Sequence, residues 1–498
     1  MTASPNLAQA FLESAARYAA KTAVFWGDDF FTYQHLAAQS RHIARRLSGE
    51  LGVQPGDRVA IWLNNCPEFI SALFGALQAG AVVVPVNCFL KADEVAYILD
   101  DSGARVLVTE EAMQAAVAKL TATRPALRLL DKAGLPPADA PDPGFTPVAR
   151  SRDDLAVLIY TSGTTGHPKG AMLTHGNLLH NVGSCRKVLE AVDVDRFALV
   201  LPMFHSFMLT VCILLPLLVG GSIVLVRSLH PPKNLLLEIL RHQATVLPAI
   251  PQLFRALAGV PPPPNLSLRL CISGAAPLPV DTLQDFNARW PARLIEGYGL
   301  SEASPVVSLN PIRGVQKPGS IGLPIPEVEI SIRDDAGREL PRGQVGELCV
   351  RGGNVMRGYW QRPEDTARTL RDGWLYTGDV GYMDADGYTY ITDRKKDMLL
   401  VNGINVYPRE IEEVIYRFPG VKEAAVIGRP DPRRGEQPVA FVALNDGQVL
   451  DTAALHAFLK EHLADYKLPR LILQVPALPR NATGKVLKTE LRKVPIEG

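Results

Sequence analysis

Residues 56–63 read Gly56-Asp57-Arg58-Val59-Ala60-Ile61-Trp62-Leu63, a turn followed by an apolar run rich in β-formers. A helical stretch follows at residues 67–79, and then a second apolar run at residues 81–86. The alternation continues with a helical stretch at 94–100 and an apolar run at 104–108. Strands and helices that alternate at this spacing predict a parallel sheet covered by helices on both faces.

The rest of the chain can be divided by its composition and its pattern of expected strands and helices. The strand–helix alternation returns between Asp154 and about Leu300, which predicts a second sheet of the same kind. Residues 136–147 are rich in Pro, Ala, Asp and Gly and read as a surface linker before that second sheet. Short strands with Gly and Pro turns begin near Pro318 and predict a small antiparallel unit. After Arg394 the chain reads as a compact α+β unit of ordinary domain size.

Composition limits the class of protein. The chain has 498 residues, a length that corresponds to about three domains. Hydrophobic residues make up 47% and charged residues 21%, as in soluble globular proteins, which argues against disorder and against a polytopic membrane protein. A net charge of +1 gives no electrostatic reason to expect a nucleic-acid partner. The six cysteines are scattered without metal-ligand spacing, so we expect reduced thiols and a cytoplasmic location.

One uncharged stretch, between Arg196 and Arg227, contains a segment long enough to cross a bilayer, residues 207–226. Two prolines and a Gly-Gly pair interrupt the stretch. The pattern therefore predicts a strand, a loop, a buried helix and a strand at residues 222–226, rather than a transmembrane span. The apolar residues 207–218 are consistent with a wall of an apolar ligand pocket.

The strongest local signal is a loop that follows an apolar strand. It reads Leu158-Ile159-Tyr160-Thr161-Ser162-Gly163-Thr164-Thr165-Gly166-His167-Pro168-Lys169-Gly170. The glycines let the backbone turn tightly and present N–H groups to an anion, while the hydroxyls and the lysine add donors suited to a polyphosphate. The P-loop pattern fails, because Lys169 follows Gly166 by three residues and precedes Gly170. The alternative interpretation is a polar surface loop without a binding function, but this combination of side chains favours phosphate binding.

Four further segments carry weaker signals. Ile295-Glu296-Gly297-Tyr298-Gly299-Leu300-Ser301-Glu302 offers glycines for close backbone approach to a ligand, a tyrosine for stacking and a carboxylate for Mg²⁺. Trp374-Leu375-Tyr376-Thr377-Gly378-Asp379 ends in a carboxylate suited to ribose hydroxyls. Asp393-Arg394-Lys395-Lys396-Asp397 is a charge run that leads into Val401-Asn402-Gly403, and Leu478-Pro479-Arg480-Asn481-Ala482-Thr483-Gly484-Lys485 places a lysine after a turn. Each of these alone is as typical of a turn or a solvated surface as of a site.

Together and in this order, the five segments closely resemble the adenylate-forming superfamily, which contains acyl-CoA synthetases, luciferases and peptide-synthetase adenylation domains. The resemblance runs from about Phe30 to Lys485, and the loop at 161–170 and the turn at 479–485 are highly specific to the superfamily. Three segments look more like fatty-acyl-CoA ligases and acyl-acyl-carrier-protein synthetases than like aryl or amino-acid activators: residues 201–207, 296–311 and 317–322.

The resemblance implies an α/β fold in two parts. A large N-terminal AMP-binding domain, residues 1–393, would contain two α/β sheet subdomains and a β-barrel-like part. A small mobile α+β domain, residues 397–498, would follow a hinge at residues 394–396. Lys396 would be the hinge residue, so the charge run would be a hinge although its texture alone favours solvated surface.

The resemblance also implies roles for single residues. The loop from Thr161 to Lys169 would grip the β- and γ-phosphates, Tyr298 would stack on adenine, and Asp379 and Arg394 would contact the ribose. The nucleotide-binding residues would be Thr161, Ser162, Gly163, Thr164, Thr165, Gly166, Lys169, Gly274, Ala275, Ala276, Glu296, Gly297, Tyr298, Gly299, Ser301, Asp379, Arg394 and Lys485.

The residues implied in catalysis are Lys485, His205, Ser301, Glu302 and Lys169. Lys485 would bridge the substrate carboxylate and the α-phosphate, and Glu302 would be the Mg²⁺ ligand. Ser301 stands where many relatives have Thr and keeps the hydroxyl that would face the α-phosphate, so we expect a tuning effect. His205 would lie where the acyl pocket meets the thiol tunnel, and Gly403 would line the path of the pantetheine arm.

The expected function is therefore ATP- and Mg²⁺-dependent activation of a medium- or long-chain fatty acid to an acyl-adenylate, followed by transfer to the CoA thiol. Two close alternatives stay open: transfer to an acyl carrier protein or a halt at the adenylate, and an aryl or branched acid as substrate. A non-catalytic binding protein would be expected to have lost the phosphate loop, Glu302, Asp379 or Lys485, and all are present. A luciferase-like oxygenase is not excluded by motif. The sequence is also compatible with a homodimer and with loose membrane association, but it requires neither.

Overall fold

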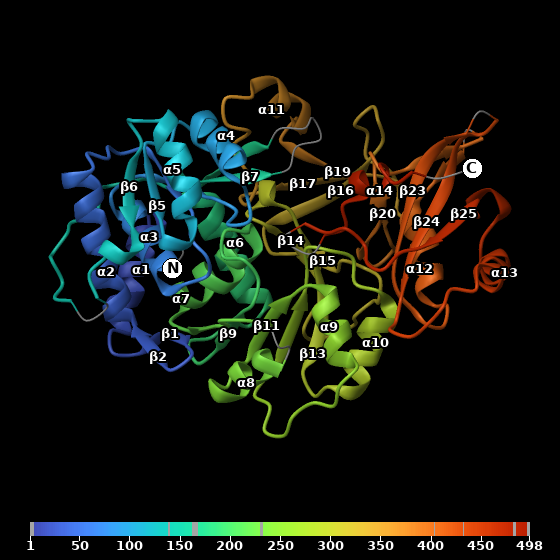
Figure 1. Ribbon diagram of the computed structural model, residues 1–498, viewed down its shortest axis with the longest axis horizontal. Helices are drawn as coiled ribbons and strands as arrows, with labels where there is room; N and C mark the ends of the chain where they lie inside the picture. The colour runs from blue at the N-terminus through green and yellow to red at the C-terminus, as the bar shows by residue number, and fades with distance from the viewer. Residues whose placement is uncertain are drawn as a thin grey trace.

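The computed structural model describes residues 4–137, 140–161, 168–229, 233–402, 404–431, 433–481 and 485–495. Figure 1 shows two neighbouring sheet layers with their helices, a set of strands beside them, and a separate lobe formed by the C-terminal part of the chain, coloured orange to red. The expected α/β architecture of a large N-terminal part and a small C-terminal part is confirmed.

The first sheet has six strands in the order β6-β5-β3-β4-β7-β8. All neighbouring strands are parallel except β7 and β8, which are antiparallel. The strands are β3 (Arg58–Ile61), β4 (Val82–Pro85), β5 (Val106–Thr109), β6 (Arg128–Asp131), β7 (Leu155–Thr161) and β8 (Lys169–Thr174). The helices along this part of the chain are α3 (Pro67–Gln78), α4 (Ala92–Ser102) and α5 (Gln114–Thr123).

The second sheet has nine strands in the order β15-β14-β13-β12-β11-β9-β10-β1-β2. Its strands are β1 (Thr22–Trp26), β2 (Asp29–Thr32), β9 (Arg196–Leu199), β10 (Ser222–Leu225), β11 (Val246–Ala249), β12 (Leu270–Ser273), β13 (Arg293–Gly299), β14 (Val306–Leu309) and β15 (Leu323–Pro324). Its helices, with the N-terminal pair, are α1 (Leu7–Arg17), α2 (Tyr33–Arg45), α6 (His175–Val188), α7 (Leu215–Val219), α8 (Lys233–Arg241), α9 (Pro251–Ala258) and α10 (Val280–Arg289).

The two sheets exchange strands, which corrects the predicted order of the subdomains. The linker at 136–147 was expected to precede the second sheet, yet β7 and β8, which follow it, complete the first. In turn, β1 and β2 from the N-terminus form an edge of the second sheet, with β1 parallel to β10. The exchange ties both sheets into one large hydrophobic core.

The uncharged stretch folds as predicted. It runs from β9 through a buried π-helical segment, Met208–Leu214, into α7 and then β10. Within the described residues, no helix is both long and apolar enough to cross a membrane.

The third sheet is the small antiparallel unit predicted after Pro318. Its strands are β16 (Val328–Arg333), β17 (Gly346–Gly352), β18 (Leu370–Arg371), β19 (Trp374–Met383) and β20 (Thr389–Arg394), and α11 (Pro363–Thr369) precedes β18. All of its pairings are antiparallel.

The C-terminal lobe is built on a fourth sheet. Its strands are β21 (Leu399–Val401), β22 (Ile404–Val406), β23 (Val421–Asp431), β24 (Gly435–Leu444) and β25 (Leu471–Gln474). Its helices are α12 (Pro408–Tyr416), α13 (Thr452–His462) and α14 (Lys488–Leu491). The lobe has hydrophobic clusters of its own, separate from the large core, which fits the expectation of a unit that can move as one body.

Candidate active site

Two adjacent strands of the third sheet bring a carboxylate and a guanidinium together. Asp379 on β19 and Arg394 at the end of β20 are register partners, and Arg394 Nε lies 3.2 Å from Asp379 Oδ1. Tyr298, near the end of β13, donates a hydrogen bond from its hydroxyl to Asp379 Oδ2 at 2.5 Å. Burial and the carboxylate raise the pKa of Tyr298 well above its ordinary value, so its hydroxyl remains a donor. Three predicted nucleotide-binding residues from three separate motifs therefore meet.

Lys485 reaches the same place from the C-terminal lobe. Its backbone N–H donates to Asn481 Oδ1 at 2.9 Å, and the Asn481 N–H donates to the Lys485 carbonyl at 2.9 Å, which closes the turn. Desolvation in the cleft and the positive charge of Arg394 lower the pKa of the Lys485 amine to about 7, although Asp379 opposes the shift. The lysine thus stands in a cationic neighbourhood that an anionic ligand would relieve.

His205 lies close enough to Lys485 to be affected by its charge. Desolvation, with the charge of Lys485, lowers the pKa of the imidazole to about 4, so His205 is neutral near pH 7. Its Nδ1 accepts a hydrogen bond from the Phe207 N–H at 3.3 Å, which fixes the ring relative to the apolar segment that begins there. With His205 neutral, Lys485 is the group at this point of the site that can carry a positive charge near pH 7.

Glu302, in a short turn after β13, is held by two neutral donors. Tyr359 donates its hydroxyl to Glu302 Oε1 at 2.9 Å, and Thr161 Oγ1 donates to the same oxygen at 3.5 Å. Mg²⁺ in proteins is commonly bound by one or two carboxylates together with substrate phosphates, so a single glutamate beside the phosphate loop fits this ion. Within the described part of the chain, no group of three or more His, Cys, Asp or Glu side chains could hold a metal by itself.

Lys169 begins β8, opposite Thr161 in the β7–β8 register. Its Nζ lies 3.0 Å from Asp365 Oδ2 and 5.6 Å from the centre of the Tyr359 ring. Hydrogen bonds from Lys169 and Arg368 lower the pKa of the Asp365 carboxyl. The predicted phosphate-binding lysine is therefore ion-paired at the base of the loop. The loop residues Ser162, Gly163, Thr164, Thr165 and Gly166 lie outside the described residues, and so does Gly403.

Ser301 contacts the apolar segment through a hydroxyl. Its Oγ lies 3.0 Å from Ser206 Oγ, next to His205. Farther along the segment, Thr210 donates to the Ser304 carbonyl at 2.8 Å. The buried Phe207 ring packs over Gly274, where a Cβ would stand 3.2 Å from the ring. The hydroxyls of Ser206 and Thr210 are thus engaged by the protein, and the surroundings of Phe207 are apolar.

The predicted adenine segment follows β12. Ala275 has a φ of +66°, in the left-handed region that alanine seldom adopts, so this backbone is constrained by its surroundings. Glu296 is buried, and its Oε1 accepts from the Leu278 N–H at 3.0 Å. Burial raises the pKa of Glu296 to about 7. This carboxyl contacts the backbone of the segment that would hold adenine, which makes it a support of the segment.

The two glycines of the 295–302 motif have a different reason from the one predicted. We expected Gly297 and Gly299 to let a ligand approach the backbone. A Cβ at Gly297 would stand 2.3 Å from Leu309 Cδ2, and a Cβ at Gly299 would stand 2.3 Å from the Pro305 carbonyl oxygen. Protein atoms of β14 and the turn before it occupy that space, so both glycines serve the packing of β13 against its neighbour.

Lys396 lies exposed in the turn between β20 and β21. The turn is closed by the Asp397 N–H, which donates to the Arg394 carbonyl at 2.9 Å, and the Lys395 N–H donates to Gly378 at 2.8 Å. The hinge at residues 394–396 stays a prediction.

The sequence reasoning missed Tyr359 and Asp365. Tyr359 contacts both Glu302 and Lys169, and Asp365 pairs with Lys169. Both lie just before or within α11, in a segment that contains no recognised motif. The Pro363-Glu364-Asp365 sequence is a recognisable helix start, but it gives no sign of the partner.

Comparisons with known proteins agree with this geometry. A family model described as AMP-binding enzyme matches residues 11–360, and one described as AMP-binding enzyme C-terminal domain matches residues 410–485. A feruloyl-CoA synthase of Amycolatopsis sp is 41% identical over 481 residues, covering 95% of each chain. A long-chain-fatty-acid–CoA ligase of Bacillus subtilis (strain 168) is 36% identical over 520 residues, covering 96% of this chain and 92% of the relative.

Solved structures are similar over the whole length. ATP-bound MatB from Rhodopseudomonas palustris is 34% identical with a TM-score of 0.91, covering 98% of both chains. An anthranilate CoA ligase in complex with anthranoyl-AMP is 30% identical with a TM-score of 0.90, covering 98% of this chain and 96% of the other.

Proposed function

Because the chain belongs to the AMP-binding enzyme family and is an ATP-dependent, AMP-forming acyl-CoA ligase, we propose that its acid is a medium- or long-chain fatty acid. The acid is activated as an acyl-adenylate with release of pyrophosphate, and CoA then displaces AMP to give the thioester. Mg²⁺ and CoA are part of this proposal.

The observation that carries the fatty-acid proposal is the apolar, uncharged segment behind His205. Between Arg196 and Arg227 the sequence has no Lys, Arg, Asp or Glu, and the π-helical segment is fully buried. The hydroxyls of Ser206 and Thr210 already have protein partners. A hydrocarbon chain needs no polar partner, whereas a second carboxylate or a phenol would be buried here without one.

The chemistry of adenylation fits the side chains that meet at Asp379. A carboxylate attacks the α-phosphate, and the enzyme's contribution is positioning and charge neutralisation. In the proposal, Asp379 and Arg394 hold the ribose, Tyr298 stacks on the base, and Glu302 holds Mg²⁺ on the phosphates. Lys485 bridges the acid carboxylate and the α-phosphate, and Ser301 offers its hydroxyl to the same phosphate.

The thioester half-reaction uses the mobility of the C-terminal lobe. In the proposal, the lobe rotates about Lys396, withdraws Lys485 and brings Gly403 toward the adenylate, so one cleft serves two reactions. His205 then lies where the thiol enters. The proposal explains why the functional residues are divided between the two lobes.

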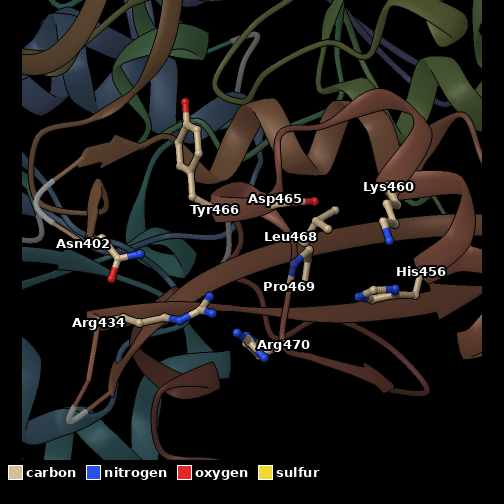
Figure 2. Close-up of a pocket in the computed structure, with 9 residues that line it drawn as sticks. All are labelled: Asn402, Arg434, His456, Lys460, Asp465, Tyr466, Leu468, Pro469 and Arg470. Carbon is tan, nitrogen blue, oxygen red and sulfur yellow. The ribbon is translucent and has the colours of Figure 1, made fainter.

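A basic pocket of about 480 Å³ beside Asn402 supports CoA as the acceptor. Figure 2 shows Arg434, Arg470 and Lys460 around it, together with His456. They come from the turn before β24, the start of β25 and α13. CoA carries a pyrophosphate and a ribose phosphate, and clustered arginines suit such groups. We include in the proposal that the CoA nucleotide binds here, next to Asn402.

An aromatic acid is the second candidate, because the feruloyl-CoA synthase of Amycolatopsis sp is 41% identical over nearly the whole chain. An aromatic ring would suit the Phe207 side chain, which lies over Gly274. The aromatic and the aliphatic substrate differ in shape and in the need for a polar partner, so a substrate panel separates them.

The test is AMP and pyrophosphate release by the purified protein with ATP, Mg²⁺ and a panel of acids: acetate, octanoate, palmitate, benzoate and ferulate. Each acid is assayed with CoA, with an acyl carrier protein and with neither. CoA-dependent AMP release with an optimum at octanoate or palmitate supports the fatty-acid ligase. An optimum at ferulate overturns the fatty-acid proposal in favour of the aromatic one. Pyrophosphate release without CoA thioester redirects the second step to a carrier protein.

The acceptor pocket has its own test. R434A is expected to raise the KM for CoA about tenfold while pyrophosphate release without CoA is unchanged, since a charged hydrogen-bond partner of a phosphate is lost. Arg433 is exposed and does not line the pocket, so R433A is the matched control. Equal effects of the two variants on the KM for CoA would remove this pocket from the proposal.

A further inference from the structure

We propose that Gln252 and Arg255 on α9 are positioning residues that hold the C-terminal lobe in the orientation in which Lys485 serves adenylation. The inference rests on the proposed role of Lys485. Neither residue belongs to the segments that carry the site, and neither contacts Asp379, Arg394 or Lys485 in a described hydrogen bond or ion pair. Their partners belong to the other lobe.

Arg255 binds the start of β23. Its Nη2 donates to the Val421 carbonyl at 2.5 Å, and its Nη1 donates to the Lys422 carbonyl. The guanidinium also lies 5.8 Å from the centre of the Tyr416 ring, at the end of α12. One planar side chain of the N-terminal part thus contacts both elements at the entry to the lobe's central sheet, and a fork of donors suits two adjacent carbonyls.

Gln252 binds the hairpin that carries Lys485. With the side-chain amide turned so that its oxygen faces Arg480, the orientation that satisfies both groups, the oxygen accepts from both terminal nitrogens of Arg480 at 2.8 Å and 2.5 Å. Arg480 also lies 2.9 Å from Glu423 Oε1 on β23. Because residues three apart on a helix share a face, Gln252 and Arg255 present their polar ends to the lobe together.

The hairpin connects the contact between Gln252 and Arg480 to the side-chain amine of Lys485. Arg480 pairs with Val486 across an isolated bridge, and Asn481 makes two hydrogen bonds with Lys485. The position of Arg480 therefore determines the position of the Lys485 backbone, from which the side chain extends. Through its contacts with Gln252 and Glu423, Arg480 links α9, β23 and the turn of Lys485 in one connected network.

These contacts can bias the two half-reactions differently. They join the two lobes, so a rotation of the C-terminal lobe breaks them. They remain intact while Lys485 is in the position for adenylation. A contact made in only one of two states shifts the population toward that state by its own free energy. The latch of Gln252, Arg255 and Arg480 should therefore favour adenylation and oppose thioester formation.

The test measures the half-reactions separately in R255A and Q252A. Adenylation is followed as single-turnover pyrophosphate release without CoA, and thioester formation is followed from a synthetic acyl-adenylate and CoA. Loss of hydrogen bonds to a charged group lowers the ratio of the two lobe orientations about tenfold, so we expect adenylation to fall by up to about tenfold. Thioester formation should be unchanged or faster. R289A is the matched control, since Arg289 on α10 is exposed and its described hydrogen bond, to the Ala258 carbonyl at 2.7 Å, stays within the N-terminal part.

A second readout separates positioning from a general loss of structure. If Arg255 acts through Lys485, R255A in a K485A background should lower adenylation no further. Equal losses in both half-reactions, or an undiminished R255A effect in that background, would overturn the inference.

A third measurement needs no turnover. Spin labels at Asp285→Cys and Glu461→Cys, both exposed positions on α10 and α13, report the distance between the lobes. Electron–electron resonance should give one main distance in the parent protein and a second population in R255A. A distribution that R255A leaves unchanged overturns the latch even if no acid of the panel is activated. A protein that activates no acid but shows the shift retains the latch and contradicts the proposed function instead.

Discussion

Tyr298 and Asp379 are joined by a hydrogen bond of 2.5 Å, although 81 positions separate them in the chain. With Tyr298 on Oδ2 and Arg394 on Oδ1, both carboxylate oxygens of Asp379 are occupied. A carboxylate oxygen can accept more than one hydrogen bond, so ribose hydroxyls would compete with these donors for Asp379, and we expect them to displace the neutral, weaker tyrosine hydroxyl.

The first prediction concerns this displacement. Y298F keeps the ring for stacking and removes the competing donor, so we expect its Kd for ATP to equal or fall below that of the parent protein. D379N removes the charge that accepts the ribose, and we expect a Kd for ATP raised about tenfold, in line with a lost charged hydrogen bond. Isothermal titration with ATP measures both. A Kd in Y298F raised as far as in D379N would contradict the displacement.

The second prediction concerns protons. In the free enzyme, the pKa of Lys485 is lowered to about 7, so between pH 7 and its ordinary value of 10.5 the amine is largely neutral. A bound α-phosphate favours the charged form and raises the pKa. Binding of ATP at pH 8 should therefore take up a proton, and ATP affinity should rise as pH falls from 9 toward 7.

Calorimetry of ATP binding in buffers of different ionisation enthalpy counts the protons taken up. K485M is the control, because its side chain has similar length and no ionisable group. Proton uptake that is the same in K485M would assign the titration to another group.

The third prediction separates the half-reactions at Lys485. K485A should lose roughly 10²–10³ in adenylation rate, by analogy with the loss of one preorganised donor to a developing charge. Thioester formation from a presynthesised acyl-adenylate should be largely spared, because the proposed rotation of the lobe withdraws this amine. Rapid-quench measurement of each step checks the prediction, and equal loss in both steps would contradict the role given to Lys485.

Much of this arrangement could be predicted because the signals are local. The apolar run at 81–86 gives β4, Val82–Pro85, since a strand buried on both faces has to be apolar throughout. The motifs that contain Tyr298, Asp379, Arg394 and Lys485 are weak signals alone, but together and in this order they resemble one superfamily. Their meeting point was implied by the resemblance, and the structure brings them together.

What could not be predicted depends on pairing between distant segments. β1 lies beside β10 because the two sheets exchange edge strands, and no local pattern records that choice. Gly297 and Gly299 were interpreted through the ligand, whereas the packing of β14 explains them. Tyr359 and Asp365 could not be found, because the Glu302 and Lys169 that they contact are far away in sequence.

The last prediction concerns Tyr359 and the proposed magnesium ligand. The Tyr359 hydroxyl holds Glu302 Oε1 at 2.9 Å, and its ring lies beside Lys169. Y359F keeps the ring and releases the carboxylate, so Glu302 must be ordered anew by each Mg²⁺–ATP that binds. We expect the Mg²⁺ concentration for half-maximal adenylation to rise about three- to tenfold, as for one hydrogen bond to a charged group, with an unchanged rate at saturating Mg²⁺. E302Q, which loses the charge itself, should also lower the saturated rate.

Tyr388 donates to the Val315 carbonyl away from the site, which makes Y388F the matched control. An Mg²⁺ dependence in Y359F that matches Y388F would show that Glu302 needs no help from Tyr359, and a dependence unchanged in E302Q would remove Glu302 as the ligand.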